Sequence, residues 1–219
     1  MIRVVDDPAA EAAELIAAAV RAGGHIALAG GSTPKAAYGI VAGMELDWSG
    51  ATVWFGDERC VPADDELSNY GMAREALLDR VEGATVKRMA GEKGPHAGAE
   101  DYERELRETL GEALPRLDLI LLGLGPDRHT ASLVPGKPAI EVKDRAVVGV
   151  EEAGMPPEVP RITLTLPAIN AARQVVFLVA GEDKSDAVQA AFGNGEGPAG
   201  LVDADVVLLD EGAASRLTR

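Results

Sequence analysis

A carboxylate and an imidazole lie two residues apart just beyond an apolar run. The run is Leu117–Leu122, and Asp127 and His129 follow it after two glycines. In α/β proteins a continuous apolar run predicts a buried strand, and ligands bind beyond the carboxyl ends of such strands. Histidine titrates near neutral pH, so the pair could perform general acid–base catalysis. The alternative is a surface loop in which the aspartate caps a helix and the histidine is solvated.

The segment Gly30-Gly31-Ser32-Thr33-Pro34 is a candidate phosphate site, because it joins a predicted strand to a predicted helix. Glycine allows a ligand close to the backbone, Ser32 or Thr33 can cap the helix, and proline suits the first helical turn. Amides at a helix N-terminus bind phosphate well. The segment is neither Gly-x-Gly-x-x-Gly nor a Walker loop, which argues against dinucleotides and nucleoside triphosphates. An ordinary capped turn is the other interpretation.

Two acids and an arginine, Asp57-Glu58-Arg59, follow the predicted strand that ends at Phe55, which suggests a polar cleft at this strand end. The planar guanidinium of Arg59 could hold a phosphate or a carboxylate. It could equally form a structural ion pair with a neighbouring acid. Asn69, a few residues later, either turns back into the same cleft or starts the next helix.

Two further cations stand near predicted strand ends. Arg161 follows the proline-rich loop 155–160, and Lys184 follows Gly181 at a strand–helix junction. The helix dipole disfavours a cation near a helix start, so the position of Lys184 is easier to explain if an anion binds nearby. Each residue alone is typical of a solvated charge. Together they predict an anion clamp.

The composition excludes several classes of protein. The 219 residues are 47% hydrophobic, which suffices for a sizeable core. The net charge of −15 argues against nucleic acid and anionic membranes, and it would also repel a phosphorylated substrate unless local donors overcome it. The single Cys60 excludes an internal disulfide, and no His or Cys pair has metal-site spacing, so we expect no metal. Neither a membrane span nor a secretory signal is visible, and we expect a cytoplasmic protein.

Helical and strand patterns alternate along the chain, which predicts an α/β protein. A mostly parallel sheet should be covered by helices on both faces. With no repeat or linker, residues 1–219 are expected to form a single domain. The predicted strands are 25–29, 52–55, 117–122, 146–150, 174–180 and 206–209, the predicted helices are 8–22, 33–42, 67–81, 97–110 and 183–192, short helices fall within 164–172 and after 209, and 83–96 is a loop or irregular strand region.

These segments, in this order, resemble the 6-phosphogluconolactonase family over essentially the whole chain. The resemblance implies a Rossmann-like fold shared with glucosamine-6-phosphate deaminase, ribose-5-phosphate isomerase and CoA transferase. Each motif alone is weak, but five in order are specific. The motifs are Gly30–Pro34, Asp57–Arg59 with Ser68-Asn69, Gly123–Ser132 with Pro135-Gly136, Arg161–Thr165 and Gly181–Lys184.

The resemblance implies hydrolysis of 6-phospho-D-glucono-1,5-lactone to 6-phosphogluconate, with no metal or organic cofactor. By analogy His129 is the general base that activates water, and Asp127 orients it. Arg59 would face the sugar or the oxyanion. The family also suggests a monomer or weak homodimer. The residues implied to hold the phosphate are Gly30, Gly31, Ser32, Thr33, Arg161 and Lys184.

One position departs from the family pattern, which usually reads Asp-Gly-His. Arg128 replaces the glycine here. If the backbone has a positive φ at this position, arginine is strained by about 1–2 kcal/mol. Alternatively, Arg128 points into the cleft as another cation.

Two rival functions share this fold. Sugar-phosphate deaminases carry a Glu-Pro-Gly where this chain has Val134-Pro135-Gly136, and an Asp-Glu-Tyr in place of Asp57–Arg59. A non-catalytic sugar-phosphate sensor normally carries a DNA-binding helix-turn-helix, for which we find no N-terminal segment, and the net charge opposes DNA. The presence of both Asp127 and His129 favours an enzyme.

Overall fold

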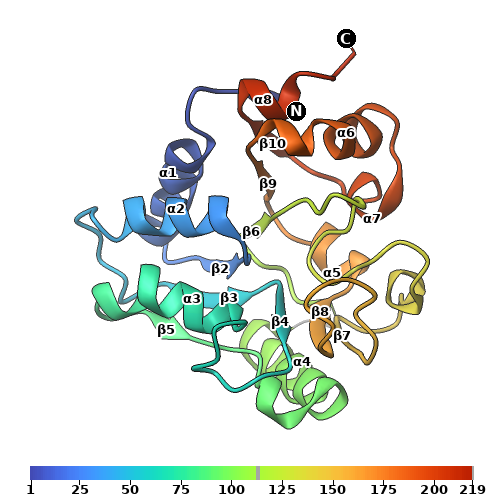
Figure 1. Ribbon diagram of the computed structural model, residues 1–219. Helices are drawn as coiled ribbons and strands as arrows, with labels where there is room; N and C mark the ends of the chain where they lie inside the picture. The colour runs from blue at the N-terminus through green and yellow to red at the C-terminus, as the bar shows by residue number, and fades with distance from the viewer. Residues whose placement is uncertain (112–113, 219) are drawn as a thin grey trace.

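The computed structural model describes residues 1–111 and 114–218 as alternating strands and helices (Figure 1). The strands are β1 (Ile2–Val4), β2 (His25–Leu28), β3 (Thr52–Phe55), β4 (Asp57–Arg59), β5 (Thr85–Val86), β6 (Leu119–Leu122), β7 (Val147–Val150), β8 (Arg161–Leu164), β9 (Val175–Val179) and β10 (Val206–Leu209). The helices are α1 (Pro8–Arg21), α2 (Ser32–Val41), α3 (Asn69–Ala76), α4 (Pro95–Leu110), α5 (Leu166–Asn170), α6 (Ser185–Val188), α7 (Gly197–Gly200) and α8 (Glu211–Ala214).

The strands form two sheets. Seven of them make a sheet in the order β1-β10-β9-β6-β2-β3-β5, in which every pairing is parallel. The other three form an antiparallel sheet in the order β4-β8-β7. The predicted α/β class with a mostly parallel sheet is confirmed.

Side chains of the central strands alternate between two hydrophobic cores, one on each face of the large sheet. Leu119 and Leu121 of β6 belong to one core, whereas Ile120 and Leu122 belong to the other. A parallel strand buried on both faces therefore reads as an unbroken apolar run, which is why β6 was recognisable in the sequence. Helices α1, α2 and α3 supply the first core, and helices α4 to α8 supply the second together with the small sheet.

The small antiparallel sheet was not predicted. The sequence predicts a strand at 146–150 within a mostly parallel sheet, and it predicts no strand over Asp57–Arg59 or Arg161–Leu164. In the structure β4 pairs with β8 and β8 pairs with β7. A three-residue charged strand carries no alternating pattern, so only its partner defines it.

Two predicted helices are interrupted. The helix expected over 67–81 begins at Asn69 and ends at Ala76, and a separate 3₁₀ turn follows over Leu78–Arg80. The helix expected over 183–192 is divided into a 3₁₀ turn (Glu182–Lys184), α6 and a π-helical turn (Gln189–Gly193). Apolar periodicity marks the buried face of such segments but does not register a local change of helix type.

The order of the strands fixes where a ligand can bind. Strand β2 leads into α2 on one face, whereas the segment after its neighbour β6 packs into the core of the opposite face through Leu124 and Leu133. A crevice forms at the carboxyl ends of adjacent strands whose connections leave on opposite faces. No helix in the described part of the chain is long and apolar enough to cross a membrane.

The contact of β7 with α4 yields a test of the fold. A methyl group on Gly149 would lie 2.6 Å from the backbone of Pro95, at the start of α4. We expect Gly149→Ala to lower the free energy of unfolding by about 1–3 kcal/mol, because neither backbone can yield easily. Gly39→Ala in α2 is the control, since its methyl would meet nothing within 4 Å. Equal stability of both variants in urea unfolding would contradict the packing.

Candidate active site

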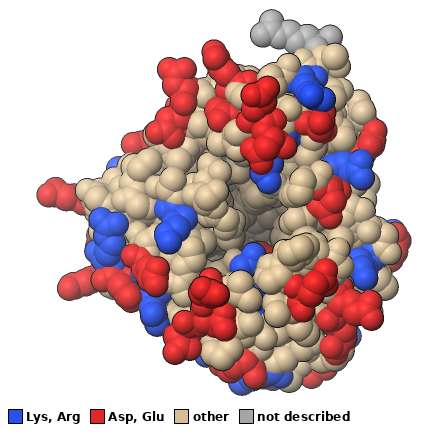
Figure 2. Space-filling view, in the orientation of Figure 1, with Lys and Arg blue, Asp and Glu red and all other residues tan. Residues whose placement is uncertain are grey.

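A cavity of about 240 Å³ lies at the carboxyl ends of β2, β6 and β9. Figure 2 shows the hollow at the centre of the molecule, with Lys and Arg side chains beside it and Asp and Glu over much of the surrounding surface. The site therefore differs in charge from the strongly acidic exterior. Its lining includes the predicted residues Gly30, Gly31, Ser32, Thr33, Arg59, His129, Arg161 and Lys184.

Asp127 lies behind the imidazole of His129 and does not line the cavity itself. Its Oδ1 is 2.5 Å from Nδ1 of His129, and the same oxygen accepts the backbone N–H of His129 at 3.2 Å. Partial burial alone would raise the pKa of Asp127, but the bonds from His129 outweigh burial and hold this pKa below its usual range. The carboxylate is thus an acceptor, which places a proton on Nδ1 and leaves Nε2 of the neutral ring unprotonated. The pair is not a helix cap with a solvated histidine.

The loop that carries His129 folds tightly on itself. Gly125 donates its N–H to the carbonyl of His129 at 2.9 Å, and the hydroxyl of Thr130 donates to the carbonyl of Gly123 at 3.0 Å. The imidazole lies over Gly125, where an added Cβ would be 2.0 Å from Nδ1. The absence of a side chain at position 125 therefore makes room for the imidazole.

Arg128 has the positive φ that we considered as one of two possibilities for the residue in place of the family's glycine. Its φ is 71°, and its side chain turns away from the cavity. Nε donates to the carbonyl of Asp127 at 3.0 Å, and Nη1 lies 3.4 Å from Glu196. The other possibility, a cation in the cleft, is wrong. Gly197 faces Arg128 closely, since a Cβ on this glycine would lie 2.7 Å from Cβ of Arg128.

The glycine-rich loop begins α2, as predicted, but its capping differs. The N-cap residue is Gly31 with a φ of 110°, and no side-chain cap bond is formed within the described residues. Ser32 and Thr33 stand inside the first turn, so the expectation that one of them caps the helix is wrong. Because no side chain occupies the amides of this turn, they can bind an anion.

Arg59 and Arg161 are directly opposite each other in the β4–β8 pair. Arg161 is only 1% exposed, and its Nη2 donates to the carbonyl of Pro157 at 3.0 Å. Nη1 of Arg59 donates to the carbonyl of Leu67 at 2.6 Å. Nε of both residues is buried without a partner. Within residues 1–111 and 114–218 neither guanidinium forms an ion pair, so the structural ion pair considered for Arg59 is absent.

Lys184 reaches the cavity from the turn after β9. It immediately precedes α6, whose first residue is Ser185. The described residues supply no carboxylate within ion-pairing distance of its ammonium group. A cation at the start of a helix without an acidic partner agrees with the anion clamp predicted from the sequence.

Glu58, unlike Asp57, does not line the cavity, and its carboxylate binds the start of α3. Glu58 caps α3, since it accepts the N–H groups of Asn69 and Tyr70 at 2.7 and 2.8 Å and the hydroxyl of Ser68 at 3.0 Å. Burial raises the pKa of Glu58 although these bonds oppose the shift. Asn69 fulfils both roles considered for it: it starts α3 and its side chain lines the cavity.

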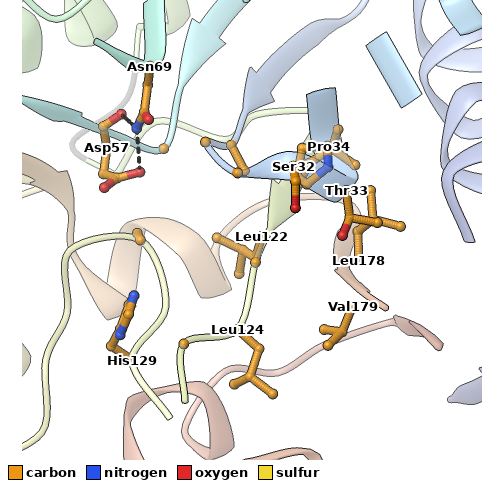
Figure 3. Close-up of a pocket in the computed structure, with 18 of the residues that line it drawn as sticks. Ser32, Thr33, Pro34, Asp57, Asn69, Leu122, Leu124, His129, Leu178 and Val179 are labelled. Carbon is orange, nitrogen blue, oxygen red and sulfur yellow. Dashed lines mark hydrogen bonds between the residues drawn. The ribbon is translucent and has the colours of Figure 1, made fainter. Parts of the chain in front are cut away.

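Sequence reasoning missed part of the cavity wall. Asp57 lines the cavity, and Met155 and Pro156 approach it from the loop between β7 and β8. The sequence predicts only a proline-rich loop over 155–160. Figure 3 shows Asp57 and His129 on one side of the pocket, with Ser32 and Thr33 on the other. Only the fold brings these segments together.

The fold and the site define an α/β protein in which an Asp–His pair and the uncapped N-terminus of α2 meet at one cavity. The family model described as glucosamine-6-phosphate isomerases/6-phosphogluconolactonase matches residues 3–209. The chain belongs to this family. A relative from Streptomyces coelicolor, named 6-phosphogluconolactonase, is 40% identical over 93% of this chain and 85% of its own length. A human relative of the same name is 38% identical over 76% of this chain and 68% of its own length.

Solved structures agree with this assignment. The 6-phosphogluconolactonase from Trypanosoma cruzi superposes with a TM-score of 0.86 at 32% identity, covering 100% of this chain and 97% of that one. A monomeric glucosamine-6-phosphate deaminase superposes with a TM-score of 0.80 at 22% identity over 99% and 98% of the two chains. At that identity the likeness to the deaminase concerns the fold alone.

The close contact between Gly125 and the imidazole can be tested. We expect Gly125→Ala to displace the His129 ring and lower kcat about 100-fold, because a misplacement of about 1 Å has an effect of that size. Gly39→Ala is the control, since its methyl would meet nothing within 4 Å and Gly39 does not line the cavity. Steady-state kinetics on the substrate proposed below would check this. Equal kcat for the two variants would contradict the geometry.

Proposed function

We propose that this protein hydrolyses 6-phospho-D-glucono-1,5-lactone to 6-phosphogluconate. The observation that carries the proposal is the contact of 2.5 Å between Asp127 and His129 at the cavity, across from the free N-terminus of α2. A base at one side and an anion site at the other suit a lactone whose phosphate is at the far end of the sugar. The names of the relatives support the same reaction.

His129 is the general base in this proposal. With a proton on Nδ1, its Nε2 takes a proton from water as the water oxygen attacks the lactone carbonyl. The tetrahedral intermediate collapses by breaking the bond between C1 and the ring oxygen. The imidazolium returns the proton to that oxygen, which becomes a hydroxyl, and the new carboxylic acid ionises in solution. Asp127 keeps the ring in its reactive tautomer and stabilises the imidazolium.

The phosphate binds, in this proposal, to the amides of the first turn of α2 together with Arg161 and Lys184. Gly30 and Gly31 let it approach the backbone, and Ser32 and Thr33 add hydroxyl donors. Arg59 faces the sugar or the developing oxyanion, where a fixed charge acts without reorganisation. These cations also solve the problem set by a net charge of −15, since they attract the dianion locally.

In residues 1–111 and 114–218 we find no observation that favours the deaminase or the sensor over the lactonase. Val134, which replaces the glutamate of the deaminases, is a buried core residue and is not part of the cavity wall. We further propose that residues 1–219 act as one domain, in the cytoplasm, as a monomer or weak homodimer that binds no nucleic acid. The two cores on opposite faces of one sheet support a single domain, and the acidic net charge opposes nucleic acid.

The reaction and its base can be tested together. Freshly generated lactone is supplied, and product is coupled to 6-phosphogluconate dehydrogenase, with the spontaneous rate subtracted. We expect His129→Ala to lower kcat by roughly 10²–10⁴, the usual worth of a general base. His96→Ala is the control, because His96 is exposed and pairs with Glu151 outside the cavity. No acceleration by the wild type would refute the function, and full activity of His129→Ala would refute the base.

The phosphate site predicts a different kinetic effect. A bond from a cation to the phosphate is worth about 1.5–3 kcal/mol, so we expect Lys184→Ala to raise KM roughly 10- to 100-fold with a smaller change in kcat. Lys35→Ala, an exposed residue of the first turn of α2 that does not line the cavity, should leave KM nearly unchanged. An unchanged KM for Lys184→Ala would remove this residue from the phosphate site.

A further inference from the structure

We propose that Asp57 is a positioning residue that fixes the loop of His129 relative to the loop that begins α2. Both loops belong to the catalytic machinery of the proposed function, and the inference rests on that function for its kinetic readout. Asp57 itself follows β3 through Gly56 and is the first residue of β4. It is 7% exposed, and it lines the same cavity as Gly30, His129 and Arg161.

The first link runs from Asp57 to the loop of His129. Ser132, three residues after His129, is 1% exposed and donates its hydroxyl to Oδ2 of Asp57 at 2.6 Å. The N–H of Ser132 donates to Oγ1 of Thr163 in β8 at 3.2 Å. Ser132 does not line the cavity, so it reaches a substrate only through the residues that it holds.

The second link runs from Asp57 to the loop before α2. Nδ2 of Asn69 donates to the backbone carbonyl of Asp57 at 2.9 Å and to its Oδ1 at 3.2 Å, as the dashed lines in Figure 3 show. The amide group of Asn69 packs closely against Gly30, since a Cβ added to this glycine would lie 2.1 Å from Oδ1 of Asn69. The side chain of Asn69 therefore sets the position of Gly30, just before the first turn of α2.

The two oxygens of a single carboxylate thus serve different halves of the site. Oδ2 accepts from Ser132, in the half that carries the base, and Oδ1 accepts from Asn69, whose side chain contacts Gly30 in the half that is proposed to receive the phosphate. Hydrogen bonds to an ionised acceptor in a buried setting are short and strong, and removing one partner leaves the other unsatisfied. The catalytic rate depends steeply on the distance between base and substrate. A shift of either loop is therefore expected to lower this rate.

The links predict a division of kinetic effects. Ser132→Ala frees only the loop of His129, so we expect kcat to fall roughly 10-fold with KM within about twofold of the wild type. Asp57→Asn weakens both links, so we expect kcat to fall and KM to rise. In the double variant Asp57→Asn/Ser132→Ala, kcat should fall no further than in Asp57→Asn alone, because both changes remove the same contact.

A hydrogen bond that only stabilises the fold is expected to affect the free energy of unfolding and not the kinetics. Thr165→Ala is the control, since its buried hydroxyl donates to the carbonyl of Arg145 at 2.8 Å outside the cavity. It should lose stability in urea without any change in kcat or KM of the folded protein. Multiplicative effects of Asp57→Asn and Ser132→Ala on kcat, or an unchanged kcat in Ser132→Ala, would overturn the proposal.

NMR of the His129 imidazole tests the role of Asp57 and Ser132 without any substrate, and so independently of the proposed hydrolysis. The chain has three histidines, so the imidazole signals of His129 in ¹H–¹⁵N spectra can be assigned with His129→Ala. We expect Ser132→Ala to shift these signals and Thr165→Ala to leave them in place. If the wild type hydrolyses no lactone but the signals shift, the function fails and the link stands. If hydrolysis is observed and the signals of Ser132→Ala do not move, the link fails alone.

Discussion

The pairing of β2 with β6 at the centre of the large sheet is the constraint on which the site depends. Ile26 pairs with Leu119 and Ala27 with Ile120, so the ends of these strands lie side by side. One end leads to a helix N-terminus and the other to a loop that carries an acid–base pair. Their connections leave on opposite faces, which opens a crevice between the two strand ends. The local sequence supplies the reactive groups at each strand end. The pairing of the two strands brings these groups close together.

Electrostatics explains why this space suits an anion. Burying an unpaired guanidinium costs free energy unless hydrogen bonds or an opposite charge compensate. Arg161 is almost wholly buried, and burial lowers its pKa while the nearby Asp57 carboxylate opposes that shift. Arg161 and Arg59 both line the cavity, and Nε of each is buried without a hydrogen-bond partner in the described residues. A protein with a net charge of −15 thereby concentrates unpaired positive charge where a phosphorylated substrate would need it.

Backbone strain is concentrated in the loop after β6. Arg128 and Ala131 have positive φ values of 71° and 48°, in a conformation that glycine tolerates best. The strain in Arg128 costs about 1–2 kcal/mol, and bonds to the carbonyl of Asp127 and to Glu196 offset part of it. Gly197 supplies the space that the arginine needs. This loop therefore keeps its shape despite the replacement of a glycine next to the proposed base.

The α/β class, the strands with unbroken apolar runs and most of the candidate site residues at the cavity could be predicted from the sequence. Buried parallel strands and strand–helix junctions have local signatures, and Asp127 and His129 are separated by a single residue, so their contact needs little of the rest of the chain. Three features could not be predicted: Arg59 and Arg161 lie opposite each other, Asp57 joins Ser132 to Asn69, and a second sheet exists. These relations connect residues far apart in the sequence, through short charged strands without a periodic pattern. They depend on strand pairing and side-chain packing, which cannot be predicted from local residue propensities.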